Sequence, residues 1–311
     1  MMRSRRRFSG HLRTSRSWCE RLLAWQVWER MLEVEFVDRS VALAGKAFVS
    51  FFPLVIVVAA FAPEGVRSSI VRTLTTRLGF RGDALVSAQE AFKSPDAVRD
   101  ATGLLGVVLA IFFATSFTTA LQRVYLRVWR RPRRSGRGAY WRGLTWLLSI
   151  LASMTVLGAI RGPLGSGLGF GLFVIITVAV TVGLWWFTAW FMLMGDVRAR
   201  ALLPTGIITG SLMAGYAASA AVWMPGVLTQ NETQFGLFGV ALALVSWFSG
   251  AAICILIGAS AGPVLTDDTG IVGSLSRGGS EPALKPDAPA AVPPPQRELT
   301  LRDAFNATEG P

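Results

Sequence analysis

Charged residues are scarce in this sequence and almost absent from its apolar stretches. Asp, Glu, Lys and Arg make up 16% of the 311 residues, whereas about a quarter is usual in soluble domains. Six long apolar stretches contain one charged side chain, that of Lys46, and neither a carboxylate nor a histidine. Because transporters driven by protons or sodium usually place a carboxylate near the middle of the membrane, this shortage argues against ion-coupled transport.

Histidine and cysteine are nearly missing as well. The one histidine, His11, lies in an Arg/Ser-rich segment, and no His, Cys or carboxylate cluster has the spacing of metal ligands. Neither a Ser/His/Asp arrangement nor a GxxxxGKS/T phosphate loop is present. Cys19 and Cys254 lie too far apart in the predicted layout to pair, so free thiols are expected. We therefore expect a protein that is not an enzyme and holds no metal or cofactor.

Long hydrophobic runs are what the sequence has instead. Each has about the 20 apolar residues that a helix needs to cross a bilayer core about 30 Å thick. Helices are expected because lipid offers backbone groups no hydrogen bonds. The sequence predicts an all-α integral membrane protein, with a bundle of six transmembrane helices within residues 37–262. The predicted spans are residues 41–62, 103–121, 144–160, 172–194, 202–224 and 235–261.

Basic residues are distributed unevenly between the two predicted sides of this bundle. The side with both termini, residues 122–143 and residues 195–201 holds 23 Lys and Arg, and the other side holds seven. Because cytoplasmic loops carry an excess of Lys and Arg, both termini are predicted to be cytoplasmic. The net charge of +12 is then explained by topology and by contact with anionic lipids. No nucleic-acid partner is expected, since basic charge alone identifies none.

Segments outside the spans have their own patterns. Residues 1–17 are predicted to be a disordered basic arm. Residues 18–36 repeat an apolar residue every three or four positions, which predicts an amphipathic helix; it either lies in the membrane interface or packs on the bundle's cytoplasmic ends. Residues 63–102 are predicted to form external surface helices, and residues 263–311 a disordered, Pro/Ala-rich cytoplasmic tail.

Two basic features are candidates for binding an anion. Lys46 lies near the cytoplasmic end of the first predicted span; it either extends its ammonium group to the interface or faces an interior cavity and binds a phosphate head group. Residues 122–143 contain eight Arg and no acid, interleaved with aromatic rings, a composition that favours anionic lipid head groups. The predicted lipid or anion contacts are Lys46, Arg123, Arg127, Trp129, Arg130 and Arg131.

Four motifs occur in order within residues 35–262. ALAGKAFVSFFPLVIV follows Asp38-Arg39, TSFTTALQRVYLRVW ends the second span, ALLPTGIITGSL begins the fifth, and the last span starts FGLFG. Together they resemble the YihY/BrkB family of bacterial inner-membrane proteins, formerly labelled ribonuclease BN. The positions that carry the resemblance are Asp38, Pro53, Leu121, Gln122, Pro204, Gly206 and Gly236.

The resemblance implies a bacterial plasma-membrane location and a suggested role in transport of a lipid or envelope precursor. Lys46 stands where the family usually has an aromatic residue, and no acid stands near Ser260. We therefore expect a transporter or organiser of an anionic lipid or envelope precursor. The alternative is a structural or scaffolding membrane protein that docks cytoplasmic partners through its basic loop and tail. A ribonuclease is the third hypothesis, and the oligomeric state stays open, a homo-oligomer included.

Overall fold

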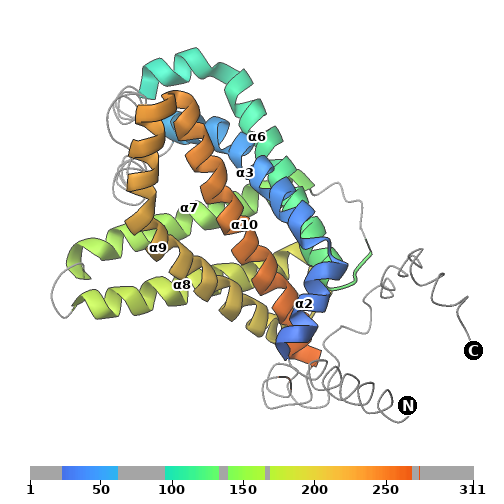
Figure 1. Cartoon of the computed structure of the whole chain (residues 1–311). Helices are drawn as coiled ribbons and strands as arrows, with labels where there is room; N and C mark the ends of the chain where they lie inside the picture. The colour runs from blue at the N-terminus through green and yellow to red at the C-terminus, as the bar shows by residue number, and fades with distance from the viewer. Residues whose placement is uncertain (1–22, 62–94, 133–138, 165–168, 268–272, 274–311) are drawn as a thin grey trace, which may run out of the picture.

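The computed structural model describes residues 23–61, 95–132, 139–164, 169–267 and 273. This part of the chain contains seven α-helices, one short 3-10 helix and no strand (Figure 1). The prediction of an all-helical chain is confirmed there. The elements are α2 (Leu23–Glu33), α3 (Phe36–Phe61), α6 (Pro95–Val128), α7 (Ala139–Leu164), α8 (Gly169–Met192), η1 (Ala199–Leu202), α9 (Leu203–Phe235) and α10 (Leu237–Asp267).

Five of these helices are long and apolar enough to cross a membrane, judged by length and composition. Five predicted spans each overlap one of them, because a continuous run of apolar residues fixes both helix and solvent. The five segments are Gly106–Val128, Trp141–Ile160, Gly169–Met192, Ala199–Phe235 and Phe238–Asp267.

The remaining predicted span, residues 41–62, lies on α3. This helix runs through Pro53 without a break. The side chains of residues 56 and 58–61 lie outside the described part of the chain. The count of six spans therefore stays a prediction.

Two helix ends differ from the sequence prediction. Helix α9 continues through the polar residues 230–234, past residue 224, where the fifth predicted span ends. It ends at Gly236, whose φ of 59° lies in the left-handed region that favours glycine. Helix α10 continues to Asp267, past the predicted start of the tail at residue 263. The rest of the tail, apart from residue 273, lies outside the described residues, as do the arm at 1–17 and residues 62–94 of the predicted external helices.

The amphipathic helix ends earlier than predicted. Helix α2 ends at Glu33, and Glu35 with a φ of 56° separates it from α3. Trp25, Trp28 and Leu32 are exposed, whereas Met31 is buried. Residues 18–22 lie outside the described part, and the interfacial location of this helix stays a prediction.

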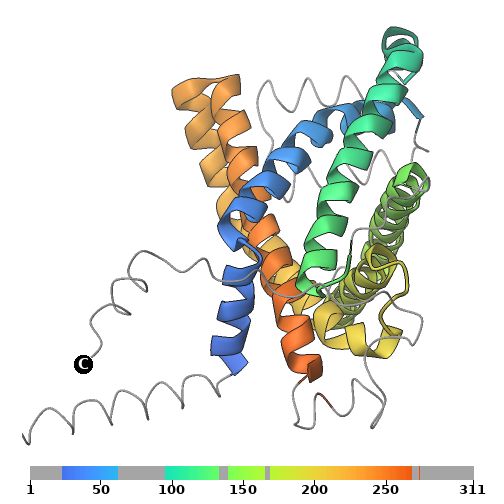
Figure 2. The same ribbon diagram turned by 90° about the vertical axis from the view of Figure 1, so that its right-hand side faces the viewer.

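Helices α9 and α10 pack along each other, and α3 packs against both α6 and α10. Helices α7 and α8 lie side by side and cross the direction of α10 (Figures 1 and 2). The larger core cluster joins α6, α8 and α10 near Tyr125, Met192 and Leu256. Other large apolar side chains face outward, with Phe238 68% and Val222 83% exposed, as expected for helices solvated by lipid rather than water.

Glycine lets α8 and α9 approach closely. A Cβ atom on Gly206 would lie 2.5 Å from the Cβ of Trp186, and one on Gly210 would lie 2.5 Å from the Cα of Val182. Real side chains do not tolerate such contacts, so both positions require glycine. The two glycines are four residues apart, the small-xxx-small spacing by which membrane helices pack backbone to backbone.

Candidate functional site

Lys46 projects from α3 toward α6. Its Nζ lies 3.5 Å from Ser116 Oγ, and the residue is half-buried. Among the described residues this hydroxyl is its one hydrogen-bond partner, and no carboxylate pairs with it. Beside it, Ser50 donates to the carbonyl of Phe113 at 2.9 Å and fixes the register of the two helices.

The ammonium group of Lys46 lies beside the apolar part of α6, toward the end of this helix that bears the arginines. Ser116 lies seven residues, about 10 Å along the helix, before Arg123, in a segment that is long and apolar enough to cross a membrane. Because Ser50 pairs with Phe113, the antiparallel register places the backbone of Lys46 opposite Phe117. The side chain therefore crosses to α6 at its own level and does not extend toward the end of α6 where the arginines lie.

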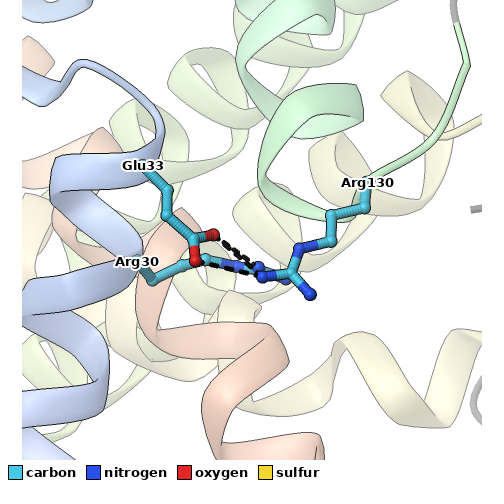
Figure 3. Close-up of polar contacts among 3 residues, drawn as sticks. All are labelled: Arg30, Glu33 and Arg130. Atoms are coloured by element: carbon cyan, nitrogen blue, oxygen red, sulfur yellow. Dashed lines mark hydrogen bonds and ion pairs between the residues drawn. The ribbon is translucent and has the colours of Figure 1, made fainter. Parts of the chain in front are cut away.

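The predicted arginines gather at that end of α6 and meet two glutamates. Glu33 accepts hydrogen bonds from Arg130 Nη2 at 2.9 and 3.1 Å and from Arg30 Nη1 at 3.0 Å. Figure 3 shows the Glu33 carboxylate pointing from α2 toward the Arg130 side chain. The three residues carry two positive charges and one negative charge, and the Asp267 carboxylate lies close enough to Arg30 to add a further negative charge.

We call Glu33 with Arg30 and Arg130 the first trio. A second trio, Glu35 with Arg39 and Arg127, lies on the other side of the break between α2 and α3. Glu35 accepts hydrogen bonds from Arg39 Nη2 at 2.7 Å and from Arg127 Nη2 at 3.1 Å. Arg39 also donates through Nε to the carbonyl of Val34 at 2.6 Å. Together the two trios attach the α2–α3 junction to the last turn of α6.

The electrostatics of the first trio follow from partial burial and close charges. Burial favours a higher pKa for Glu33, but hydrogen bonds from Arg130 and Arg30 outweigh burial and lower the pKa below its ordinary value. Burial lowers the pKa of Arg30, and the nearby positive charge of Arg130 lowers it further. Glu33 therefore stays ionised and partly neutralises two arginines.

Two predicted head-group contacts are buried instead. Trp129 is 7% exposed and Arg131 is 4% exposed, so neither presents a surface to a lipid. The reason is local: Arg130 has a φ of 51°, which ends α6 and folds the next residues back onto the core. Burial lowers the pKa of the Arg131 guanidinium, and the buried Asp196 carboxylate opposes that shift.

The structure does not gather all the predicted contacts into one site. Lys46 lies beside Ser116 between α3 and α6, Arg127 and Arg130 lie in the trios, and Arg123 is exposed. Sequence reasoning missed Glu33 and Glu35, because their partners Arg130 and Arg127 lie 97 and 92 residues away along the chain. No pattern pointed to Ser116, which lies 70 residues from Lys46 in the chain.

The residues that carry the family resemblance lie at contacts between helices or in the first turns of helices. Gln122 donates to the carbonyl of Met192 at 3.3 Å and joins α6 to the end of α8. Leu121 is fully buried beside it. Asp38 lies in the first turn of α3, and Pro204 in the first turn of α9.

A shallow apolar groove of about 580 Å³ runs along α9 and α10. One residue, Cys254, comes from α10 and the rest come from α9. Its lining is Ile207, Ile208, Ser211, Leu212, Gly215, Tyr216 and Cys254. The groove lies on two segments that are long and apolar enough to cross a membrane, so its surface suits a hydrocarbon chain.

Comparisons with protein-family models, curated proteins and solved structures found no match to this chain. Within the described residues, no group of three or more His, Cys, Asp or Glu side chains is placed to hold a metal ion. His11, the Arg-rich residues 133–138 and most of the tail lie outside that part, so the ribonuclease and scaffolding hypotheses stay untested.

Proposed function

We propose that this chain is a non-enzymatic, multi-pass plasma-membrane protein that moves or organises an anionic lipid or envelope precursor. The observation that carries the proposal is the half-buried Lys46 ammonium, which lies between two apolar helices beside a serine hydroxyl without a carboxylate partner among the described residues. An anionic head group supplies the missing negative charge.

The energetic argument concerns an uncompensated charge in an apolar bundle. A Lys at the centre of a membrane helix costs about 2.5–3.5 kcal/mol on insertion scales. One neutral hydroxyl at 3.5 Å offsets little of that cost. A phosphate or carboxylate that passes between α3 and α6 gains a charge-assisted hydrogen bond there, so the site favours anionic over zwitterionic molecules.

The ends of the bundle fit the same proposal. The trios on Glu33 and Glu35 leave a net positive charge at the end of α6, and Arg123 is exposed nearby. In the proposed orientation this is the cytoplasmic face, where basic residues contact anionic lipids. Six spans and membership of the YihY/BrkB family belong to the proposal too.

Lipid movement in reconstituted vesicles tests the proposal. The purified full chain is placed in liposomes with fluorescent phosphatidylglycerol or fluorescent phosphatidylcholine, and dithionite measures the dye that reaches the outer leaflet. We expect faster loss than in empty vesicles, and more so for phosphatidylglycerol. Rates equal to empty vesicles for anionic phospholipids and for anionic envelope precursors would overturn the transport proposal.

A further inference from the structure

The groove along α9 and α10 ends close to a basic residue. The backbone runs from η1 into α9 in helical conformation through Leu202 and Leu203, so residues 200–216 form one continuous helical stretch. Arg200 and Ile207 are seven residues apart, about two turns, and therefore lie on nearly the same face. Arg200 is exposed and forms no ion pair with another described residue.

Exposed residues connect this arginine to the groove. Leu203 is 41% exposed and Ile207 is 51% exposed, and Ser211 and Gly215 are exposed beyond them. No side chain fills the space over Gly215, where an added Cβ would meet no atom within 4 Å. The path from Arg200 to Tyr216 is about 24 Å long, enough for a head group and the acyl chain of one leaflet, which is about 15 Å deep.

We propose that this groove is a binding site for one anionic phospholipid, with an acyl chain against α9 and α10 and the phosphate group at Arg200. The site names the ligand class of the proposed function and rests on it. Charge and polarity both match: a cation stands at one end, and the lining between Ile207 and Cys254 is apolar. A zwitterionic lipid fills the groove without gaining a net attraction to Arg200.

A second copy of the chain fits the groove less well. Two copies in one membrane are related by an axis along the membrane normal, so the same face of each α9 would meet and Arg200 would face Arg200. No Asp or Glu occurs between residues 199 and 231 to neutralise that pair. An anionic lipid is therefore the occupant that the charges favour.

Photo-crosslinking tests the site without any transport step. The full chain in nanodiscs is exposed to phosphatidylglycerol or phosphatidylcholine carrying a diazirine in the acyl chain, and labelled peptides are identified by mass spectrometry. We expect labelling of residues 207–216 and of Cys254, stronger with phosphatidylglycerol. Gly215→Leu fills the groove and lowers this labelling, whereas Gly226→Leu, an equal change at another open position of α9, leaves it unchanged.

The charge is tested separately. Arg200→Gln lowers labelling by phosphatidylglycerol about fivefold, the effect of one basic residue beside an anionic lipid, and leaves labelling by phosphatidylcholine unchanged. The control Arg142→Gln, at the start of α7, changes neither. Equal labelling by both lipids with no effect of Arg200→Gln overturns the proposal, as does a bis-maleimide crosslink between Cys254 of two copies in a Cys19→Ser background. Lipid movement that persists without this labelling leaves the transport proposal standing and removes only the site.

Discussion

At the scale of single residues, position in the fold decides what each basic side chain does. Lys46, Arg127 and Arg131 look alike in a basic sequence. Lys46 lies beside the hydroxyl of Ser116, Arg127 pairs with Glu35, and Arg131 is buried near Asp196. Their partners lie far along the chain, 92 residues away for Arg127, so composition predicted basic character but not its use.

The close contact at Gly206 gives a prediction at this scale. Gly206→Ala places a methyl group against the backbone of Trp186, and overpacking of this kind costs about 1–3 kcal/mol. We expect a lower midpoint of thermal unfolding in detergent. Gly183→Ala on α8 is the control, because no atom lies within 4 Å of its added Cβ. If both variants were equally stable, the inferred backbone contact between α8 and α9 would be wrong.

At the scale of elements, local patterns predicted the helices and missed their connections. Continuous apolar runs marked α7, α8, α9 and α10, since length and hydrophobicity are local properties. The extension of α9 to Phe235 was missed because polar residues near its end resembled a turn. The groove was also missed, since it arises from the packing of α9 on α10 and not from either helix alone.

The docking of α2 gives the first prediction for an element. Glu33→Gln leaves two arginines without their shared carboxylate, so we expect faster amide hydrogen exchange across Leu23–Glu33. Exposed ion pairs contribute a few tenths to about 1 kcal/mol, and the expected change is of that size. Glu29→Gln on the same helix is the control, because Glu29 accepts a hydrogen bond from Trp25, which also lies on α2. Equal exchange in both variants would contradict the role of the trio.

The pH dependence of the contact between Glu33 and its two arginines gives the second prediction for an element. The pKa of Glu33 is lowered in the folded protein, so the contribution of its ion pairs is complete above the ordinary glutamate pKa of 4.5. This contribution is lost as the pH falls through the lowered value. Protection of the α2 amides, corrected for the pH dependence of intrinsic exchange, should therefore fall in acid in the wild type and fall less in Glu33→Gln. The same acid response in both proteins would assign it to another group.

At the scale of the whole molecule, the proposed orientation requires α9 to pass from one side of the membrane to the other. Arg200 and Gln230 are both exposed and lie 30 residues apart, about 45 Å along a helix. In a Cys19→Ser background, we expect Arg200→Cys to react with impermeant maleimide only from the cytoplasm and Gln230→Cys only from outside. Labelling of both from the same side would overturn the proposed topology.

The proposed function depends on the charge of Lys46 serving an anionic lipid between α3 and α6. The direct measurement compares Lys46→Met with Lys46→Arg in vesicles containing fluorescent phosphatidylglycerol, at matched amounts of inserted protein. The account predicts that the methionine variant moves this lipid roughly tenfold more slowly or worse, since a hydrogen bond to a charged group contributes about 1.5–3 kcal/mol, while arginine retains most of the rate. Equal rates for the wild type and Lys46→Met would contradict it.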